Sequence, residues 1–207
     1  MELCAGASGL SVSRGTVQVD DTVLIEKCRK QDFEAFGKFV DIYESRVHGF
    51  VRRMVGSTED AYDVTQEVFI RAFQNFPRFD HRSNVKTWIF RIAYNLCIDR
   101  SRKSSRSPKE TSIDAAEGDI AIEVPDDRWD PGQLLLDEEL ANIVEKAISS
   151  MSEKLKSVLL LHDREGASYD EISQVLALPV GTVKSRLFLA RAHLQNELKP
   201  YLRGETK

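Results

Sequence analysis

The stretch of sequence that decides the fold reads SYDEISQVLALPVGTVKSRLFLARAHL and spans residues 168–194. Ser168 and Glu171 form an S-x-x-E capping box, which predicts a short helix over residues 169–176. The sequence LPVG at 178–181 then predicts a tight turn. The apolar residues that follow recur at helical spacing and predict a second helix with one buried face: Val183, Leu187, Ala190 and Leu194. Two helices joined by such a turn fit helix-turn-helix geometry, in which the second helix enters the major groove of DNA.

The exposed face of that second helix is polar and basic. Arg and Lys side chains reach guanine edges and phosphates, Ser and Thr hydroxyls bond to either, and the helix N-terminus adds backbone donors for a phosphate. The predicted contacts with duplex DNA are Thr182, Lys184, Ser185, Arg186, Phe188 and Arg191. The alternative is an ordinary helical hairpin with a solvated basic face, because a motif of this kind needs structural context to be decisive.

The N-terminal part of the chain follows the same helical period. Asp20 or Asp21 can cap a short helix that runs to Lys30, and Asp32 can cap a longer helix that Gly56 ends. The longer helix carries one apolar stripe with spacings of three and four: Phe36, Phe39, Val40, Tyr43, Val47, Phe50, Val51 and Met54. We therefore expect a helical domain here.

Two more helices complete this first domain. The third is predicted to begin at Ser57, with Asp60 in the capping-box position, and to stop before Pro77. After the loop FPRFDHRSN, the fourth is predicted to run from about Val85 to Lys103. Its expected buried line consists of Trp88, Ile92 and Leu96, with Ile89 and Ala93 beside it.

The third helix carries an acidic ridge within the sequence DVTQEVFIRAF. Asp63 and Glu67 lie one turn apart, and Arg71 a turn beyond partly offsets their repulsion. This ridge, with Gln66 and Ile70 near it, is suited to docking on a basic partner surface. A solvated helix face is an equally good interpretation of these residues.

The fourth helix places aromatic side chains among cations. With the Trp88 stripe buried, Phe90 and Tyr94 fall on the sides or the opposite face of the helix, next to Lys86 and Arg91. Unstacked bases stack on such rings while Lys and Arg hold the nucleic-acid backbone. Packing of Phe90 and Tyr94 against a neighbouring helix is the equal alternative, because large aromatic side chains are costly to leave in water.

Charge is segregated along the chain, although the net charge is only -4. Residues 78–109 contain nine Lys or Arg against two Asp, whereas residues 110–139 contain eleven Asp or Glu against one Arg. The segment 104–133 is too poor in large apolar residues to bury a core and is predicted to be a linker. We predict an all-α protein with a mobile tail (1–20), two small helical domains (21–103 and 134–207) and a flexible acidic linker (104–133) between them.

Several classes of protein are excluded by what the sequence lacks. No stretch approaches the roughly 18 apolar residues of a membrane span, and the first residues do not resemble a leader, so we expect a cytoplasmic protein without stable membrane insertion. Cys4, Cys28 and Cys97 are odd in number and widely spaced, which predicts reduced thiols, with a redox switch at Cys97 as the alternative. We find no catalytic triad order, phosphate-binding glycine loop or metal-ligand cluster, and therefore expect no enzyme, catalytic residue, cofactor or metal.

Three motifs stand in order along the chain: DVTQEVFIRAF at 63–73, TWIFRIAYNLCIDRSRK at 87–103 and the helix-turn-helix stretch at 168–194. With the acidic linker between the second and third, they closely resemble the extracytoplasmic-function sigma factors, the smallest promoter-recognition subunits of bacterial RNA polymerase. The resemblance spans about Asp21 to Leu198. The chain departs from it in two places: Leu189 stands where many relatives carry a basic residue, and the loop FDHRSN lacks their common glycine.

The resemblance implies a role for each surface. The third helix would dock on the polymerase clamp through Asp63, Gln66, Glu67 and Ile70. The loop and fourth helix would capture the non-template strand of the melted minus-10 element through Phe79, Asn84, Lys86, Arg91 and Asn95. The second domain would read the minus-35 element as duplex through Lys184, Ser185, Arg186 and Arg191.

The resemblance also implies three partners: core RNA polymerase, promoter DNA and an anti-sigma factor that holds the protein inactive. The main alternative is a helix-turn-helix repressor or activator that never joins polymerase. Such a regulator would bind a symmetric operator as a dimer, whereas a sigma factor would bind core polymerase one to one.

Overall fold

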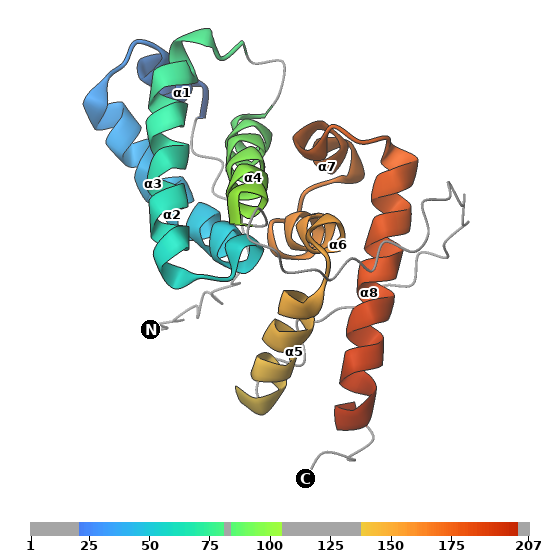
Figure 1. Cartoon of the computed structure of the whole chain (residues 1–207). Coiled ribbons are helices and arrows are strands. Elements are labelled where there is room, and N and C mark those ends of the chain that lie inside the picture. Colours follow the sequence, from blue (N-terminus) through green and yellow to red (C-terminus); the bar gives the residue numbers. More distant parts are fainter. Residues whose placement is uncertain (1–20, 81–83, 105–137, 203–207) are drawn as a thin grey trace, which may run out of the picture.

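The computed structural model describes residues 21–80, 84–104 and 138–202, and all regular structure within these ranges is helical (Figure 1). The first half consists of α1 (Asp21–Arg29), α2 (Phe33–Val55), α3 (Thr58–Asn75), the short 3-10 helix η1 (Phe76–Arg78) and α4 (Val85–Ser104). The second half consists of α5 (Glu138–Ser150), α6 (Glu153–Leu159), the π-helical turn η3 (Leu160–Arg164), α7 (Tyr169–Leu176) and α8 (Val180–Leu202). The predicted all-α fold is confirmed. The predicted tail and nearly all of the predicted linker lie outside the described residues.

The helices begin and end where their capping residues place them. Asp32 Oδ1 accepts hydrogen bonds from the backbone amides of Glu34 (2.9 Å) and Ala35 (3.1 Å), which starts α2. Gly56 ends α2 in the left-handed conformation, with φ of 76°. Ser57 caps α3 by accepting from the Asp60 amide. The predicted capping of both helices is therefore confirmed.

The first half is built around an aromatic cluster at the end of α3. The Phe76 ring lies 4.9 Å from the Phe39 ring and 4.9 Å from the Trp88 ring, both in edge-on contact. Such edge-to-face pairs are favoured by the aromatic quadrupole. Because Pro77 follows Phe76 and cannot continue an α-helix, the chain turns through η1 and carries Phe79 back onto Trp88, 5.2 Å away. The cluster thereby joins α2, α3 and α4.

The buried line of α4 is shifted from the predicted one to the residues predicted beside it. Ile89, Ala93 and Cys97 are fully or nearly fully buried, whereas Trp88 and Ile92 are only half-buried. Leu96, the third residue of the predicted line, is buried. The difference arises because α4 packs against α2 and α3 on one side and against α7 on another, so more than one face of the helix is covered.

The second half is a helix-turn-helix unit supported by α5 and α6. The capping box at the start of α7 is formed in full, since the Glu171 amide donates to Ser168 Oγ (3.2 Å) and the Ser168 amide donates to Glu171 Oε2 (2.8 Å). The predicted inward face of α8 is buried: Val183, Leu187, Ala190 and Leu194 are all at most 3% exposed. Ser152 stands at the start of α6, but its side chain makes no capping hydrogen bond.

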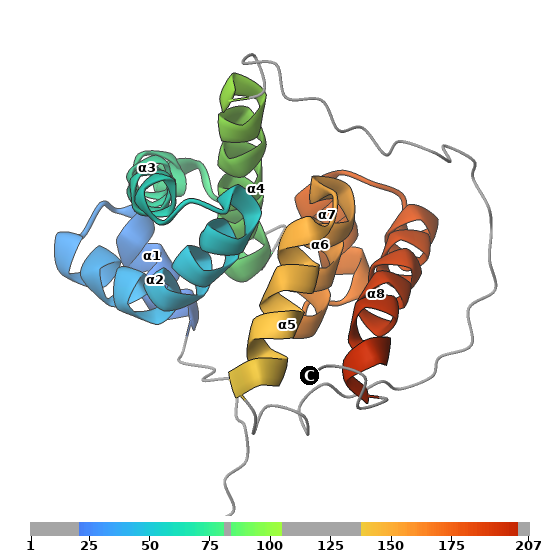
Figure 2. The same cartoon turned by 60° about the horizontal axis from the view of Figure 1, so that its bottom comes forward.

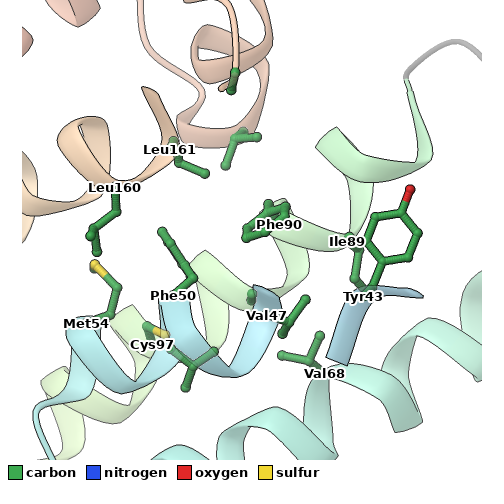
Figure 3. Close-up of a cluster of buried hydrophobic side chains, with 14 of the residues drawn as sticks. Tyr43, Val47, Phe50, Met54, Val68, Ile89, Phe90, Cys97, Leu160 and Leu161 are labelled. Carbon is green, nitrogen blue, oxygen red and sulfur yellow. The ribbon is translucent and has the colours of Figure 1, made fainter. Parts of the chain in front are cut away.

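The two halves pack against each other, which the sequence did not predict. Helix α4 lies along α7 (Figures 1 and 2), and the buried side chains of both halves form one continuous cluster. At its centre, Phe50, Met54 and Phe90 of the first half face Leu160 and Leu161 of the second (Figure 3). We call these five residues the inter-half interface. Fully burying one such side chain contributes about 1.5–3 kcal/mol, so the contact is a substantial part of the fold.

The turn between α7 and α8 forces Ala177 into the left-handed conformation, with φ of 53°. This conformation costs a residue with a Cβ atom about 1 kcal/mol, and glycine adopts it freely. We predict that Ala177→Gly raises the free energy of unfolding by about 0.5–1 kcal/mol in urea denaturation. Ala192→Gly inside α8 is the matched control and should lower it by about 1 kcal/mol. Equal losses at both positions would contradict the left-handed turn.

Candidate nucleic-acid interface

Helix α8 presents a polar face at its N-terminal end. Lys184 is exposed, whereas Thr182, Ser185 and Arg186 are half-buried. Ser185 Oγ donates a hydrogen bond to the Thr182 carbonyl oxygen (3.1 Å), and Lys184 Nζ lies 5.6 Å from the centre of the Tyr169 ring. These four residues follow a tight turn, as a helix that enters a DNA groove requires.

Two large apolar side chains extend this polar face. Phe188 is 38% exposed and Leu189 is 50% exposed. Neither side chain is buried against another helix, although Leu187 before them and Ala190 after them are buried. Exposed apolar groups on a recognition helix are suited to contact with the methyl group of thymine.

Arg191 does not share this exposed face, although the sequence predicted it as a DNA contact. Its guanidinium bonds Asp163 Oδ1 at 2.8 Å, and the two side chains are 24% and 16% exposed. His162 Nδ1 lies 2.7 Å from the same oxygen, and the His162 ring stacks on Tyr169 with 5.3 Å between ring centres. Burial would raise the pKa of Asp163, but hydrogen bonds from His162 and Arg191 outweigh it and hold that pKa below its usual value. Arg191 thus ties α8 to η3.

The predicted minus-10 residues divide between the surface and the interior. Asn84, Arg91 and Asn95 are exposed, and Asn84 Oδ1 accepts a hydrogen bond from the Lys86 amide (2.9 Å) at the start of α4. Phe79 is only 4% exposed and packs on Trp88 and Phe76, so its ring is a core side chain in this structure. This burial could not be predicted from local sequence, because Phe79 lies in a segment predicted as a loop.

Lys86 and Phe90 both lie where α4 meets the second half. Lys86 is half-buried and its Nζ donates to the backbone carbonyl of Glu165. Burial lowers the pKa of Lys86, and the nearby Arg46 lowers it further. Phe90 is 1% exposed and meets Phe50 edge-on at 5.5 Å. Of the two alternatives for Phe90, packing against a neighbouring helix is the one observed.

The acidic ridge of α3 is on the surface. Asp63 and Gln66 are exposed and Ile70 is 51% exposed, while Glu67 pairs with Arg71 at 2.7 Å. Tyr62, which is not among the predicted site residues, is 59% exposed one turn before Gln66. Because Tyr62, Gln66 and Ile70 recur every four residues, they line one face beside the carboxylates.

A groove of about 490 Å³ separates this ridge from the C-terminal end of α4. Its walls carry Asp63, Glu67 and Arg71 from α3, and Asp99, Arg100, Arg102 and Lys103 from α4. Val64 and Leu96 contribute apolar surface. Both signs of charge line it, so it is suited to a protein segment with mixed charge rather than to a small apolar ligand.

The two described cysteines are buried and unpaired. Burial raises the pKa of the Cys97 thiol to about 12 and that of the Cys28 thiol to about 11. Because the thiolate is the reactive species, neither group is suited to redox chemistry at neutral pH. Across residues 21–80, 84–104 and 138–202, no three His, Cys, Asp or Glu side chains gather as metal ligands, and no helix is long and apolar enough to cross a membrane.

Comparison with known families finds one match in each half of the chain. Residues 39–107, which include α3 and α4, match Sigma-70 region 2. Residues 141–194, which include α6, α7 and most of α5 and α8, match Sigma-70, region 4. The helix-turn-helix and α4 thus belong to two distinct regions of one family.

The relatives cover almost the whole chain. The ECF RNA polymerase sigma-E factor of Escherichia coli strain K12 is 36% identical over 192 residues, which are 90% of this chain and 98% of that protein. The factor of the same name from Haemophilus influenzae is 35% identical over 188 residues, which are 89% of this chain and 98% of that protein.

Two solved structures share the fold. CnrH in complex with the cytosolic domain of CnrY has a TM-score of 0.63 at 24% identity and covers 87% of this chain and 98% of that chain. The sigma factor RpoE of Bartonella quintana in complex with the anti-sigma factor NepR has a TM-score of 0.60 at 22% identity and covers 79% of this chain and 96% of that chain. From the two matched regions and the 36% identity to sigma-E, we conclude that the chain belongs to the extracytoplasmic-function RNA polymerase sigma factors, which are initiation factors and not enzymes.

Proposed function

We propose that this chain binds bacterial core RNA polymerase in the cytoplasm and directs it to specific promoters as an alternative sigma factor. The observation that carries the proposal is that one sigma-family chain has two separate polar helix faces whose chemistry suits DNA. One is the exposed face of α8, and the other is the exposed strip of α4. The contribution of the protein is positional, since it brings polymerase and promoter together and catalyses no step itself.

The α8 face would read the minus-35 element as duplex. Lys184 and Arg186 would bond phosphates or guanine edges, and Ser185 and Thr182 would bond either. Phe188 would contact an apolar base edge. Arg191 would affect DNA binding only indirectly, because its bond to Asp163 holds α8 at a fixed position on η3.

The exposed strip of α4 would bind the non-template strand of the minus-10 element. Asn84, Arg91 and Asn95 offer amide and guanidinium groups to unstacked bases and to the backbone. Lys86 would join them once its bond to Glu165 is broken. Phe79, which is buried, would stabilise this surface by packing against Trp88.

The α3 ridge would dock on the polymerase. Asp63 and Glu67 supply charge, and Gln66 and Ile70 supply a polar and an apolar contact beside them. We infer that an anti-sigma factor regulates the chain by competing for surfaces of this kind. The support is the Bartonella relative, whose structure was solved with an anti-sigma factor bound.

Core polymerase from Escherichia coli provides the direct test of the proposal. We predict a one-to-one complex and initiation at asymmetric start sites above the level of core alone. Ile70→Glu should weaken core binding at least about tenfold, since it places a charge at an apolar contact. Val23→Glu, which changes a similarly exposed apolar residue on α1, should not. A dimer that binds a symmetric operator, with no initiation, would establish the repressor or activator alternative.

The salt dependence of duplex binding tests the assignment of α8. We predict that Lys184→Ala weakens binding to minus-35 duplex and lowers the slope of log K against log salt concentration by about 1, because one phosphate contact is lost. Arg191→Ala should leave that slope unchanged, since its guanidinium bonds Asp163. An equal reduction of the slope by both variants would show that Arg191 also reaches the DNA.

The Asp163–Arg191 ion pair should also contribute to the free energy of unfolding. We predict that Arg191→Ala lowers the free energy of unfolding at pH 7 by about 3 kcal/mol, because it leaves a poorly exposed carboxylate without its cation. The pKa of Asp163 is lowered in the folded chain, so the pair contributes fully above about pH 4 and its contribution is lost as pH falls through the folded pKa. The difference between the two proteins in urea denaturation should therefore shrink below pH 4. A difference that is constant with pH would contradict the ion pair.

A further inference from the structure

Leu189 is an exposed apolar residue of α8 to which the proposed function assigns no role. Its side chain is 50% exposed, and the neighbouring Phe188 is 38% exposed. Among the side chains described in the second half (residues 140–201), these two are the only large apolar ones that are exposed. A single exposed apolar residue is ordinary on a protein surface. Two adjacent ones on a helix proposed to enter a DNA groove are candidates for contact with base edges.

Leu189 lies at the end of a row of residues that can reach base edges together. Residues at the spacing i, i+3, i+4 and i+7 share one face of a helix, and the recognition helix of a homeodomain reads bases from four positions with this spacing. On α8 the four positions are Thr182, Ser185, Arg186 and Leu189. All of them fall within about the first three turns of the helix, directly after the turn that follows α7 (Figure 1). Leu189 can therefore enter the same groove as Ser185.

The surroundings of Leu189 are poorly suited to reading guanine. Guanine is read best by an Arg or Lys side chain that bonds both of its major-groove acceptors. Of the three cations within residues 180–191, Lys184 alone is exposed, whereas Arg186 is half-buried and Arg191 is held in an ion pair with η3. The leucine side chain itself can donate no hydrogen bond. The base that Leu189 meets must therefore be recognised by an apolar group.

Ser185, one turn before Leu189, provides a hydrogen-bond acceptor. Its Oγ donates its one proton to the Thr182 carbonyl oxygen at 3.1 Å, so that its lone pairs are left to accept. In the major groove, the amino groups of adenine and cytosine are the donors, and thymine is the base that presents a methyl group. An A·T pair offers both an amino group and a methyl group on this edge. The acceptor of Ser185 and the apolar side chain of Leu189 together suit A·T pairs.

We propose that Leu189 is a specificity-determining residue of the exposed α8 face and that it contacts the methyl group of a thymine in the major groove. The inference rests on the duplex-reading role proposed for α8 and names one base that this face prefers. The contact is favourable because it removes apolar surface of both groups from water. An Arg side chain at the same position would favour guanine instead. The identity of residue 189 thus decides which of two bases binds there.

Exchange of thymine for uracil tests the methyl contact, because deoxyuridine lacks the methyl group and keeps every hydrogen-bonding group of thymine. A pool of short duplexes with a randomised centre is first enriched for binding to the full chain at low salt. Each thymine of the enriched duplex is then replaced by deoxyuridine in turn. We predict that one replacement weakens binding about fourfold, the factor expected for one buried methyl group, and that the others have little effect. At the same position, 5-methylcytosine should bind more tightly than cytosine.

Substitution of residue 189 assigns the contact to this side chain. Leu189→Ala should weaken binding to the thymine duplex about fourfold and should bind the thymine and uracil duplexes equally. Phe188→Ala removes the neighbouring exposed side chain and is the matched control, which should keep the discrimination between the two duplexes. Leu189→Arg, taken through the same enrichment, should select guanine in place of that thymine. Because both positions are exposed, none of these variants removes a core side chain.

The outcomes separate this inference from the proposed function. The inference is overturned, and the role of α8 stands, if no thymine of the enriched duplex needs its methyl group or if Leu189→Ala discriminates as the parent does. Weaker binding of Leu189→Ala to core polymerase, with discrimination unchanged, would overturn it in favour of a protein contact. If neither the free chain nor its complex with core polymerase enriches any sequence, the duplex-reading role itself fails, and the inference fails with it.

Discussion

Helix α4 is packed on more than one side, and the arrangement of the whole chain depends on this. Ile89 and Ala93 are completely buried, and Phe90 reaches Phe50 and the second half. A helix covered in this way keeps only a narrow strip for solvent, and that strip carries Arg91 and Asn95. Packing therefore decides which α4 side chains nucleic acid can reach in this structure. The sequence pattern of aromatics and cations does not decide it.

The same packing explains how an acidic chain can present basic surfaces. The net charge is -4, yet two cations of α2 are matched to carboxylates of the second half: Arg46 to Glu165 and Arg53 to Glu145. These acids neutralise cations at the inter-half contact, whereas Lys184 is exposed on α8. The field that a DNA phosphate meets follows the local patch and not the sum over the chain.

The features that could be predicted from the sequence are those that depend on residues close together along the chain. The caps at Asp32, Gly56 and Ser168 were predicted correctly because each bonds groups within three or four residues. The inward face of α8 was predicted correctly because helical periodicity alone determines it. The exposed α3 ridge followed from the same periodicity. These local signals were sufficient for the fold class and for most helix boundaries.

The residues whose contacts were not predicted have partners far away in the sequence. Arg191 bonds Asp163, which lies 28 residues earlier, and Phe90 packs against Phe50 and Leu161. Trp88 and Ile92 were predicted to be buried because the prediction assumed one buried face for α4, whereas the second half covers another. No pattern within a single helix contains this information, since it arises only when the two halves are brought together.

The case of Arg191 also bears on how a recognition helix works. Such a helix delivers its first residues to the groove only if the preceding elements fix its angle. Here three contacts fix it: the Asp163–Arg191 pair joins η3 to α8, the His162–Tyr169 stack joins η3 to α7, and the Ser168–Glu171 box fixes the start of α7. Basic residues of one helix therefore divide into those that are exposed and free to meet DNA, such as Lys184, and those that hold the helix in place. A substitution at Arg191 would alter promoter binding through the angle of α8, and the DNA sequence preferred by Lys184, Ser185 and Phe188 would change only as far as that angle changes.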